Sequence, residues 1–295
     1  MPRSLHCVFA QRTPLDPTTA VERLREDVAE LVTTYPSAHM LVFPEVHLFG
    51  GAELSGDEDS WYRALAEPIP GPRTETLGRI ARDHGVWLIP GSLPELGDNG
   101  DLFNTAVVFS PDGVLSDAYR KVFPWRPSEP WTAGTTFSAF DIPLTGRVGI
   151  NICYDSWYPE ATRQIAWMGA EAVFNLVKTT TPDREQELVL ARANAITNQV
   201  FYLSLNAAGP IGMGRSIFVD PHGRVLYESP DAREEGIYLE LDLDEVTSVR
   251  ATGTAGINRL WSQFREEDSP IDLPAYGGRI DPQLWIAREK NGHRP

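Results

Sequence analysis

Residues 147–166 have the sequence RVGINICYDSWYPEATRQIA. Apolar residues alternate with small or polar ones from Val148 to Ile152, which predicts a short strand with one apolar face. The apolar spacing after Pro159 predicts a helix. Cys153 therefore falls where a strand ends and a turn leads into a helix. We expect this position to expose the thiol at the edge of a sheet and to lower its pKa. The alternative is that Cys153 is only a small buried hydrophobe.

The composition limits the classes of protein to which the chain can belong. Its 295 residues are 42% hydrophobic and 23% charged, which is ordinary for a globular protein. The net charge of −15 and the pI near 4.8 argue against nucleic acid or an anionic membrane as a partner. There is no apolar run of about 20 residues, and Cys7 and Cys153 are too few for a disulfide framework. We therefore expect a cytoplasmic protein without a membrane partner.

No motif for a metal or a cofactor is present in the sequence. The six histidines lack HxxH or HExxH spacing, and there is no CxxC pair. A Cys–His protease would need a histidine with a local signature, and none of the six has one. We therefore expect thiol chemistry without histidine, metal or cofactor.

Two further candidates also follow predicted strands. Glu45 comes after the buried strand predicted at 40–43, and Lys121 ends the strand predicted at 114–119. The carboxyl ends of strands are where α/β folds place working residues. With Cys153 these residues could perform acyl transfer, in which the carboxylate moves protons and the ammonium stabilises a negative oxygen. The backbone N–H of Tyr154 could be a second donor to that oxygen.

The loop after Lys121 has the sequence VFPWRPSEPWTAG and contains Trp125, Glu129 and Trp131. Three prolines stiffen it, so Glu129 can be held close to the lysine. The two tryptophans either pack in the core or form the wall of a ligand pocket, and the sequence leaves both open.

Strands and helices alternate along the chain, with hairpins at similar points in two halves, 5–152 and 153–241. This pattern predicts an α/β fold in which layered sheets are covered by helices. Beyond Gly256 the chain turns polar and rich in proline. We therefore predict a main domain at 1–255 and a C-terminal arm at 256–295.

The chain resembles the nitrilase, or carbon–nitrogen hydrolase, superfamily. Three segments carry the likeness: Phe43-Pro-Glu45, Tyr119-Arg-Lys121 and Gly149-Ile-Asn-Ile-Cys-Tyr-Asp155 with Tyr158-Pro-Glu160. Further signatures are Asn104-Thr105, Arg192-Ala193, Asn198-Gln199, Asn206 with Gly209, and Ser216 with Asp220-Pro-His-Gly223. The likeness covers residues 5–250 and implies a four-layer αββα sandwich.

The resemblance also implies roles for the candidate residues. Glu45 would be the general base and acid, Lys121 the oxyanion stabiliser and Cys153 the nucleophile. Glu129 matches a second glutamate of many members, and the loop that holds it is similar to the aliphatic amidase and formamidase branch. Lys178 lies where carbamoylase-like relatives bind a substrate carboxylate. The chain departs from many relatives at Val122-Phe123 and at Thr197, and the long C-terminal extension of aliphatic amidases is missing or much shortened. These differences concern the subfamily and not the three catalytic candidates.

Three functions remain open on the sequence alone. The first is an amidase that hydrolyses a small carboxamide through a thioester and releases ammonia. The second is an N-carbamoyl amidohydrolase, or a nitrilase, of the same superfamily. The third is a catalytically silent binding protein. By resemblance we also expect a homodimer or higher homo-oligomer that pairs through helices near 157–169 and 183–197, with the segment 256–295 reaching towards the partner.

Overall fold

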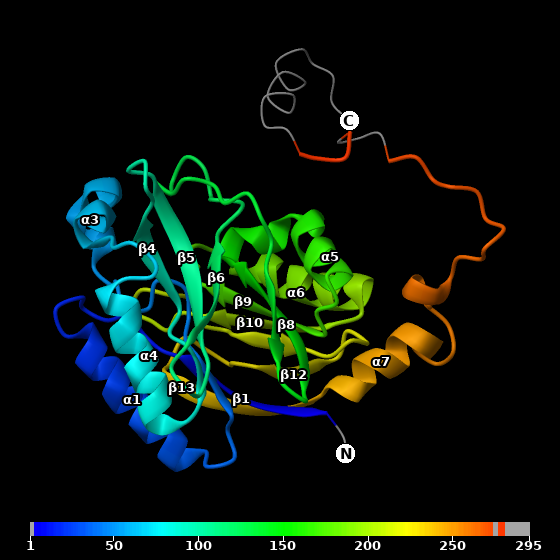
Figure 1. The fold of residues 1–295 in the computed structure, drawn as a ribbon, viewed down its shortest axis with the longest axis horizontal. Helices are drawn as coiled ribbons and strands as arrows, with labels where there is room; N and C mark the ends of the chain where they lie inside the picture. The colour runs from blue at the N-terminus through cyan, green and yellow to red at the C-terminus, as the bar shows by residue number, and fades with distance from the viewer. Residues whose placement is uncertain (1–2, 274–276, 281–295) are drawn as a thin grey trace. The chain divides into compact units, whose positions relative to one another are not determined.

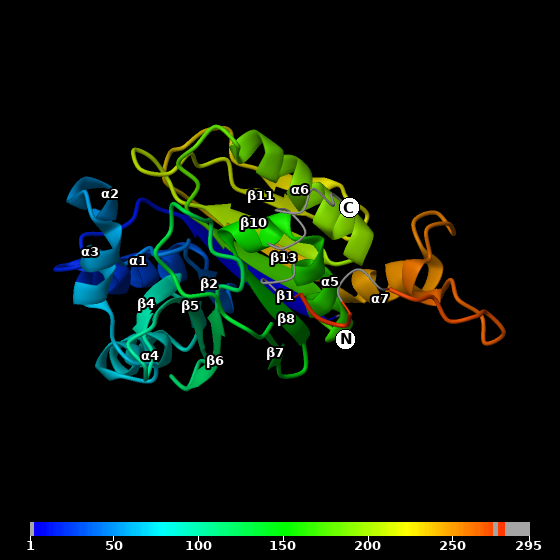
Figure 2. The same ribbon diagram turned by 90° about the horizontal axis from the view of Figure 1, so that it is seen from above.

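The computed structural model describes residues 3–273 and 277–280. Residues up to Leu260 form one compact unit, and Trp261 begins a second. In the first unit two β-sheets pack face to face, and helices cover the outer face of each (Figures 1 and 2). The predicted four-layer αββα sandwich is therefore confirmed.

The first sheet combines the start of the chain with a late strand. Its order is β13 (Glu235–Asp242), β1 (Ser4–Gln11), β2 (Met40–Val42), β3 (Trp87–Ile89), β5 (Leu102–Phe109) and β4 (Ser92–Leu96), with β6 (Leu115–Arg120) paired to β5. The pairs β1–β2 and β2–β3 are parallel, and β1–β13 is antiparallel.

The second sheet is built from the middle of the chain. Its order is β12 (Val225–Glu228), β11 (Ile217–Val219), β10 (Phe201–Asn206), β9 (Ala172–Val177), β8 (Gly146–Ile152) and β7 (Ala139–Ile142). The strands β8, β9 and β10 are parallel, so their carboxyl ends lie at one edge of this sheet.

The helices are divided between the two outer layers. The first sheet is covered by α1 (Ala20–Thr34) and α4 (Pro72–His84), whose apolar faces join its core cluster. The second is covered by α5 (Pro159–Trp167) and α6 (Arg184–Asn198), which contact β8 and β10 (Figure 1). The remaining helices are α2 (Ala52–Ser55), α3 (Glu58–Leu65), α7 (Leu243–Thr252) and the short 3₁₀ turns η1 (Cys153–Trp157) and η2 (Leu260–Ser262).

Side chains alternate along β1, so the strand packs against the other sheet on one face and against helices on the other. Cys7 and Phe9 point into the core between the sheets, whereas Val8 and Ala10 pack under the helices. The ring of Phe9 lies 5.2 Å from that of Phe174 in the other sheet. Because both faces of β1 are buried, its sequence is a nearly continuous apolar run.

The predicted halves, 5–152 and 153–241, are wrong in their boundary. The strands β7 and β8 lie before Cys153 but belong to the second sheet, and β13 returns to the first sheet. Local sequence does not predict the strand β4, because Pro94 in Ser92–Leu96 argues against a strand. It is tolerated here because β4 stands at the end of the sheet order.

The predicted boundary at 255 falls near the end of the first compact unit. The arm predicted at 256–295 lies partly outside the described residues, since 274–276 and 281–295 are not among them. Its proposed contact with a partner therefore stays a prediction. No helix in the described part of the chain is long and apolar enough to cross a membrane.

Candidate active site

The candidate residues follow strands that end close together. Glu45 comes shortly after β2, and Lys121 directly follows β6. Cys153 follows β8 and Lys178 follows β9, two parallel neighbours whose carboxyl ends share an edge. The backbone N–H of Lys178 donates a hydrogen bond to Glu45 Oε2 at 3.0 Å, which joins the two sheets at this edge. The fold therefore gathers residues that are far apart in the sequence.

Glu45, Lys121 and Glu129 form a buried cluster of charges. Lys121 Nζ donates to Glu45 Oε1 at 3.0 Å and to both carboxylate oxygens of Glu129, at 2.7 and 2.8 Å. The side chains of Lys121 and Glu45 are 0% and 2% exposed, and that of Glu129 is 17% exposed. Two carboxylates thus share one ammonium with almost no solvent to screen them.

Other donors fix the orientation of the two carboxylates. Asn104 Nδ2 donates to Glu45 Oε1 at 2.8 Å, so this oxygen accepts from both an amide and an ammonium. The backbone N–H of Trp125 donates to Glu129 Oε2 at 2.8 Å, which closes the proline-rich loop onto its own carboxylate. Asn104 is buried in the interior of β5.

The charges of this cluster support one another. Burial opposes the charge on Lys121, but Glu129 and Glu45 outweigh it and raise the pKa of Lys121 well above its ordinary value. Burial also raises the pKa of Glu129, although Lys121 acts against this. The ammonium therefore stays protonated throughout the neutral range.

The expectation of a lowered thiol pKa is wrong. Burial and then the negative charge of Glu45 raise the pKa of Cys153 well above its ordinary value, while Lys121 only partly opposes them. A helix end can be recognised in the local sequence, whereas the burial of the sulfur and the charge of Glu45 arise only from the fold. The resting thiol is therefore neutral, and it needs a base before it can act as a nucleophile.

The backbone is unusual at two positions in this region. Cys153 has φ of 48° and Val46, directly after Glu45, has φ of 43°. This left-handed region disfavours residues with a Cβ, and a β-branched valine in particular. Such conformations persist where the surrounding structure imposes them, and they concentrate at functional sites.

Asp155 connects the cysteine turn to the loop after Lys121. Its carboxylate accepts from the backbone N–H groups of Ile152 at 2.9 Å and Phe123 at 2.8 Å, and from the hydroxyl of Tyr119 at 2.8 Å. Burial raises the pKa of Asp155 to about 6. This residue appeared in the sequence only as part of a motif, and the structure shows that it joins the segments carrying Lys121 and Cys153.

The predicted substrate-binding residues lie in different environments. Tyr154 is half-buried in η1, directly after Cys153. Trp125 is 38% exposed, whereas Trp131 is 2% exposed and packs against Tyr62 with the ring centroids 4.4 Å apart. Trp131 is thus part of the core beneath the first sheet. The roles of these residues in binding substrate stay predictions.

Lys178 has partners that the sequence did not indicate. Its Nζ lies 2.6 Å from Glu53 Oε1 and 3.3 Å from the hydroxyl of Tyr62. Glu53 belongs to α2 and Tyr62 to α3, and nothing in the local sequence of either helix indicates Lys178 as its partner.

A second buried ion pair also lies near the thiol. Arg184 Nη1 and Glu187 Oε2 in α6 are 2.9 Å apart, and Glu187 also accepts from the hydroxyl of Thr179. The charge of Glu187 adds to the raised pKa of Cys153. Among the described residues, no group of three or more His, Cys, Asp or Glu side chains could hold a metal ion.

Comparison with known proteins decides the family. A model described as carbon-nitrogen hydrolase matches residues 8–251. The chain belongs to the carbon–nitrogen hydrolase family. This carbon–nitrogen hydrolase is 34% identical over 210 residues to the omega-amidase NIT2 of Homo sapiens, with 64% of this chain and 74% of the relative covered. It is 29% identical over 194 residues to a formamidase of Bacillus cereus, with 65% and 57% covered.

A solved structure agrees with the assignment. Saccharomyces cerevisiae Nit3, a member of branch 10 of the nitrilase superfamily, superposes with a TM-score of 0.75 at 25% identity, covering 84% of this chain and 94% of that one. The predicted superfamily is therefore confirmed, as is the prediction of a carbon–nitrogen hydrolase enzyme.

Proposed function

We propose that this carbon–nitrogen hydrolase is an amidase that cleaves a small carboxamide through a thioester on Cys153. The observation that carries the proposal is the buried cluster of Glu45, Lys121 and Glu129 beside a neutral thiol. Relatives named omega-amidase and formamidase support amide hydrolysis as the reaction class.

The first half-reaction forms the thioester. Glu45 takes the thiol proton as the sulfur attacks the amide carbon. This base is needed because the raised pKa of Cys153 keeps the resting thiol protonated. The carbonyl oxygen becomes negative, and the Lys121 ammonium and the backbone N–H of Tyr154 stabilise it. Glu45 returns the proton to the nitrogen, the C–N bond breaks, and ammonia leaves the acyl-enzyme.

The second half-reaction consumes water. Glu45 removes a proton from the water as its oxygen attacks the thioester carbon, and Lys121 again stabilises the negative oxygen. The C–S bond then breaks, the thiol regains its proton, and the carboxylic acid is released. Glu129 keeps Lys121 in place through two hydrogen bonds and would orient the substrate N–H and the water.

A screen for ammonia release tests this proposal. The purified protein would be offered butyramide, an N-carbamoyl amino acid and butyronitrile in parallel. We expect turnover of the amide, its loss in Cys153→Ala, and its retention in Cys7→Ala, which removes the other thiol of the chain. Preferred release from the carbamoyl compound or the nitrile would replace the amidase proposal by the second function. A Cys153→Ala variant that keeps its turnover would refute the thiol mechanism.

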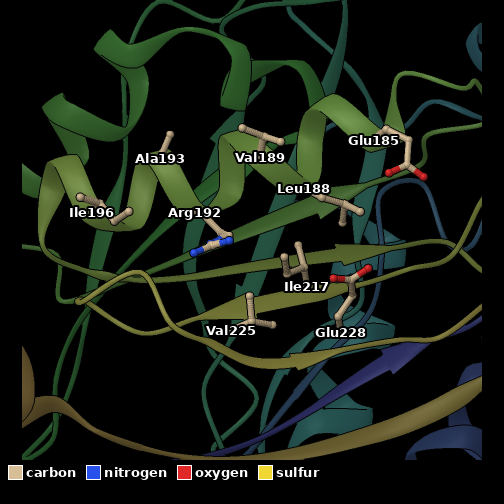
Figure 3. Close-up of a pocket in the computed structure, with 9 residues that line it drawn as sticks. All are labelled: Glu185, Leu188, Val189, Arg192, Ala193, Ile196, Ile217, Val225 and Glu228. Atoms are coloured by element: carbon tan, nitrogen blue, oxygen red, sulfur yellow. The ribbon is translucent and has the colours of Figure 1, made fainter.

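We also propose that the protein is a homo-oligomer. Figure 3 shows a groove between α6 and the hairpin β11–β12, lined by apolar side chains and by Glu185, Arg192 and Glu228. Val189, Ile196 and Val225 in this groove are 67%, 45% and 41% exposed, and Trp167 at the end of α5 is 72% exposed. Apolar surface of this kind marks interaction sites in soluble proteins. A second copy of the chain would cover it.

A further inference from the structure

Lys178 is joined to the proposed catalytic carboxylate of Glu45 through its backbone, and its side chain ends in an ammonium. Its backbone N–H donates to Glu45 Oε2 at 3.0 Å. Burial opposes the charge on the ammonium, but Tyr62, Glu53 and then Glu45 outweigh it and raise the pKa of Lys178. The side chain is 13% exposed. An ammonium at this position would suit a substrate that carries a carboxylate.

That ammonium already has a counter-ion. Glu53 Oε1 lies 2.6 Å from Lys178 Nζ, and the Glu53 side chain is 27% exposed. Burial favours the neutral form of Glu53, but Lys178 outweighs it and lowers the pKa of Glu53 below its ordinary value. Both groups are therefore charged at neutral pH. The Tyr62 hydroxyl, at 3.3 Å from Nζ, supplies a further acceptor.

The charges around the site show what this pair does. Two carboxylates, those of Glu45 and Glu129, contact the single ammonium of Lys121. The ammonium of Lys178 adds a second cation, and Glu53 adds a third carboxylate. A substrate carboxylate would therefore enter a site in which carboxylates outnumber ammonium groups and the ammonium of Lys178 is already paired. It would lose its hydrating water without gaining a counter-ion.

We propose that Glu53 acts through Lys178 to restrict the site to uncharged carboxamides. Glu53 is a positioning residue here, because it forms an ion pair with the ammonium of Lys178 and acts on the substrate only through that ammonium. The inference rests on the proposed amidase function and specifies its substrate class. The relative named formamidase fits this class, because formamide is a neutral amide.

Two amides with the same four-carbon chain test the inference. Butyramide is neutral, and succinamate carries a carboxylate at the far end. We expect the wild type to have the higher kcat/KM for butyramide. In Glu53→Gln, kcat/KM for succinamate should rise at least about tenfold, mainly through a lower KM, because the freed ammonium becomes its partner. The value for butyramide should stay within about threefold.

Two variants show that the effect passes through Lys178. The double variant Glu53→Gln with Lys178→Met keeps the backbone N–H to Glu45 but lacks the ammonium, and it should lose the gain for succinamate. Glu58→Gln removes the same charge from α3 and leaves the Glu53–Lys178 pair in place, so its substrate ratio should match the wild type.

The outcomes that contradict the inference differ from those that contradict the amidase proposal. A wild type that prefers succinamate, or an unchanged substrate ratio in Glu53→Gln while ammonia is still released, would overturn the inference alone. Absence of ammonia from both amides with the wild type and with Glu53→Gln would overturn the amidase proposal and the inference together.

Discussion

Cys153 and Cys7 differ in what surrounds their sulfur atoms. Burial raises the pKa of both thiols, but Cys7 is 0% exposed within β1, whereas Cys153 is partly exposed at the end of β8. We expect iodoacetamide to alkylate Cys153 at least about tenfold faster than Cys7 in the folded protein, since the reagent must reach the sulfur. Peptide mass spectrometry over a time course measures both rates. Earlier modification of Cys7 would contradict the placement of Cys153.

Glu129 holds Lys121 with both oxygens, so its replacement should affect turnover more than binding. In Glu129→Gln the amide NH₂ would face the ammonium of Lys121 or the N–H of Trp125, both of which are donors. We expect kcat to fall by about 10²-fold or more, as for loss of a positioned acid–base group, with a modest change in KM. Steady-state ammonia release measures both constants.

Glu95 in β4 provides a matched control for Glu129. Glu95 is 5% exposed and pairs with Arg120, the residue before Lys121. Glu95→Gln removes a similar buried carboxylate from outside the cluster, so it should lower stability and leave kcat within about twofold. A Glu129→Gln variant whose kcat resembles that of Glu95→Gln would reduce Glu129 to a structural residue of its loop.

At the scale of single residues, the candidate catalytic residues could be predicted from the sequence, but the contacts between their side chains could not. Glu45, Lys121 and Cys153 each follow a recognisable strand, so their candidacy could be predicted from local patterns. Glu53 could not be, because its partner Lys178 lies 125 residues away and nothing in either local sequence indicates the other. The raised thiol pKa was not predictable either, because it depends first on burial of the sulfur in the fold and then on Glu45, which follows a strand of the other sheet.

At the scale of elements, Asp155 connects the turn at Cys153 to the loop after Lys121 through its hydrogen bonds. We expect this connection to affect the pH dependence of stability. Burial raises the pKa of Asp155 to about 6 in the folded chain, above the ordinary value of 3.8. The folded protein therefore binds this proton more tightly than the unfolded chain. The group contributes most stability below pH 3.8, and this contribution is lost as pH rises through about 6.

Asp155→Asn removes this titration. We expect the free energy of unfolding of the wild type minus that of Asp155→Asn to fall by about 2 kcal/mol between pH 4.5 and pH 7. Urea unfolding at several pH values measures the difference. Asp141→Asn is the control, because Arg147 lowers the pKa of this exposed carboxylate and it should add no slope over the same range. A difference that does not change with pH would show that Asp155 is not held as described.

Helices and strands could be predicted where residues close together in the sequence show the apolar spacing of the element. The apolar spacing after Pro159 predicts a helix; it ends at Trp167, and Gly169 follows it with φ of 97°, a conformation that favours glycine after a helix end. The pairing of β13 with β1 was not predictable, because it joins residues more than 220 positions apart. Local sequence therefore gives a strand its conformation, but the fold decides its sheet.

At the scale of the whole molecule, the net charge of −15 acts against self-association. Any dimer therefore has to gain enough from burial of apolar surface to offset repulsion between two acidic chains. Trp167 of α5 and Val189 and Ile196 of α6, with the groove of Figure 3, are the exposed apolar surface that we propose for this contact. Added salt would screen the repulsion, so it should strengthen such a dimer.

Val189 provides the test of this assembly. Its side chain is 67% exposed on α6, and a symmetric dimer that covers this helix would bury it on both copies. Light scattering at micromolar concentration should give a wild-type mass of about twice 32.8 kDa. Val189→Lys would place two unpaired ammonium groups in the contact, so this variant should fall to the monomer mass. Val114→Lys makes the same change at a 59% exposed position in the turn between β5 and β6 and should remain dimeric. A wild type of 33 kDa, or equal masses for the two variants, would place the contact elsewhere or exclude it.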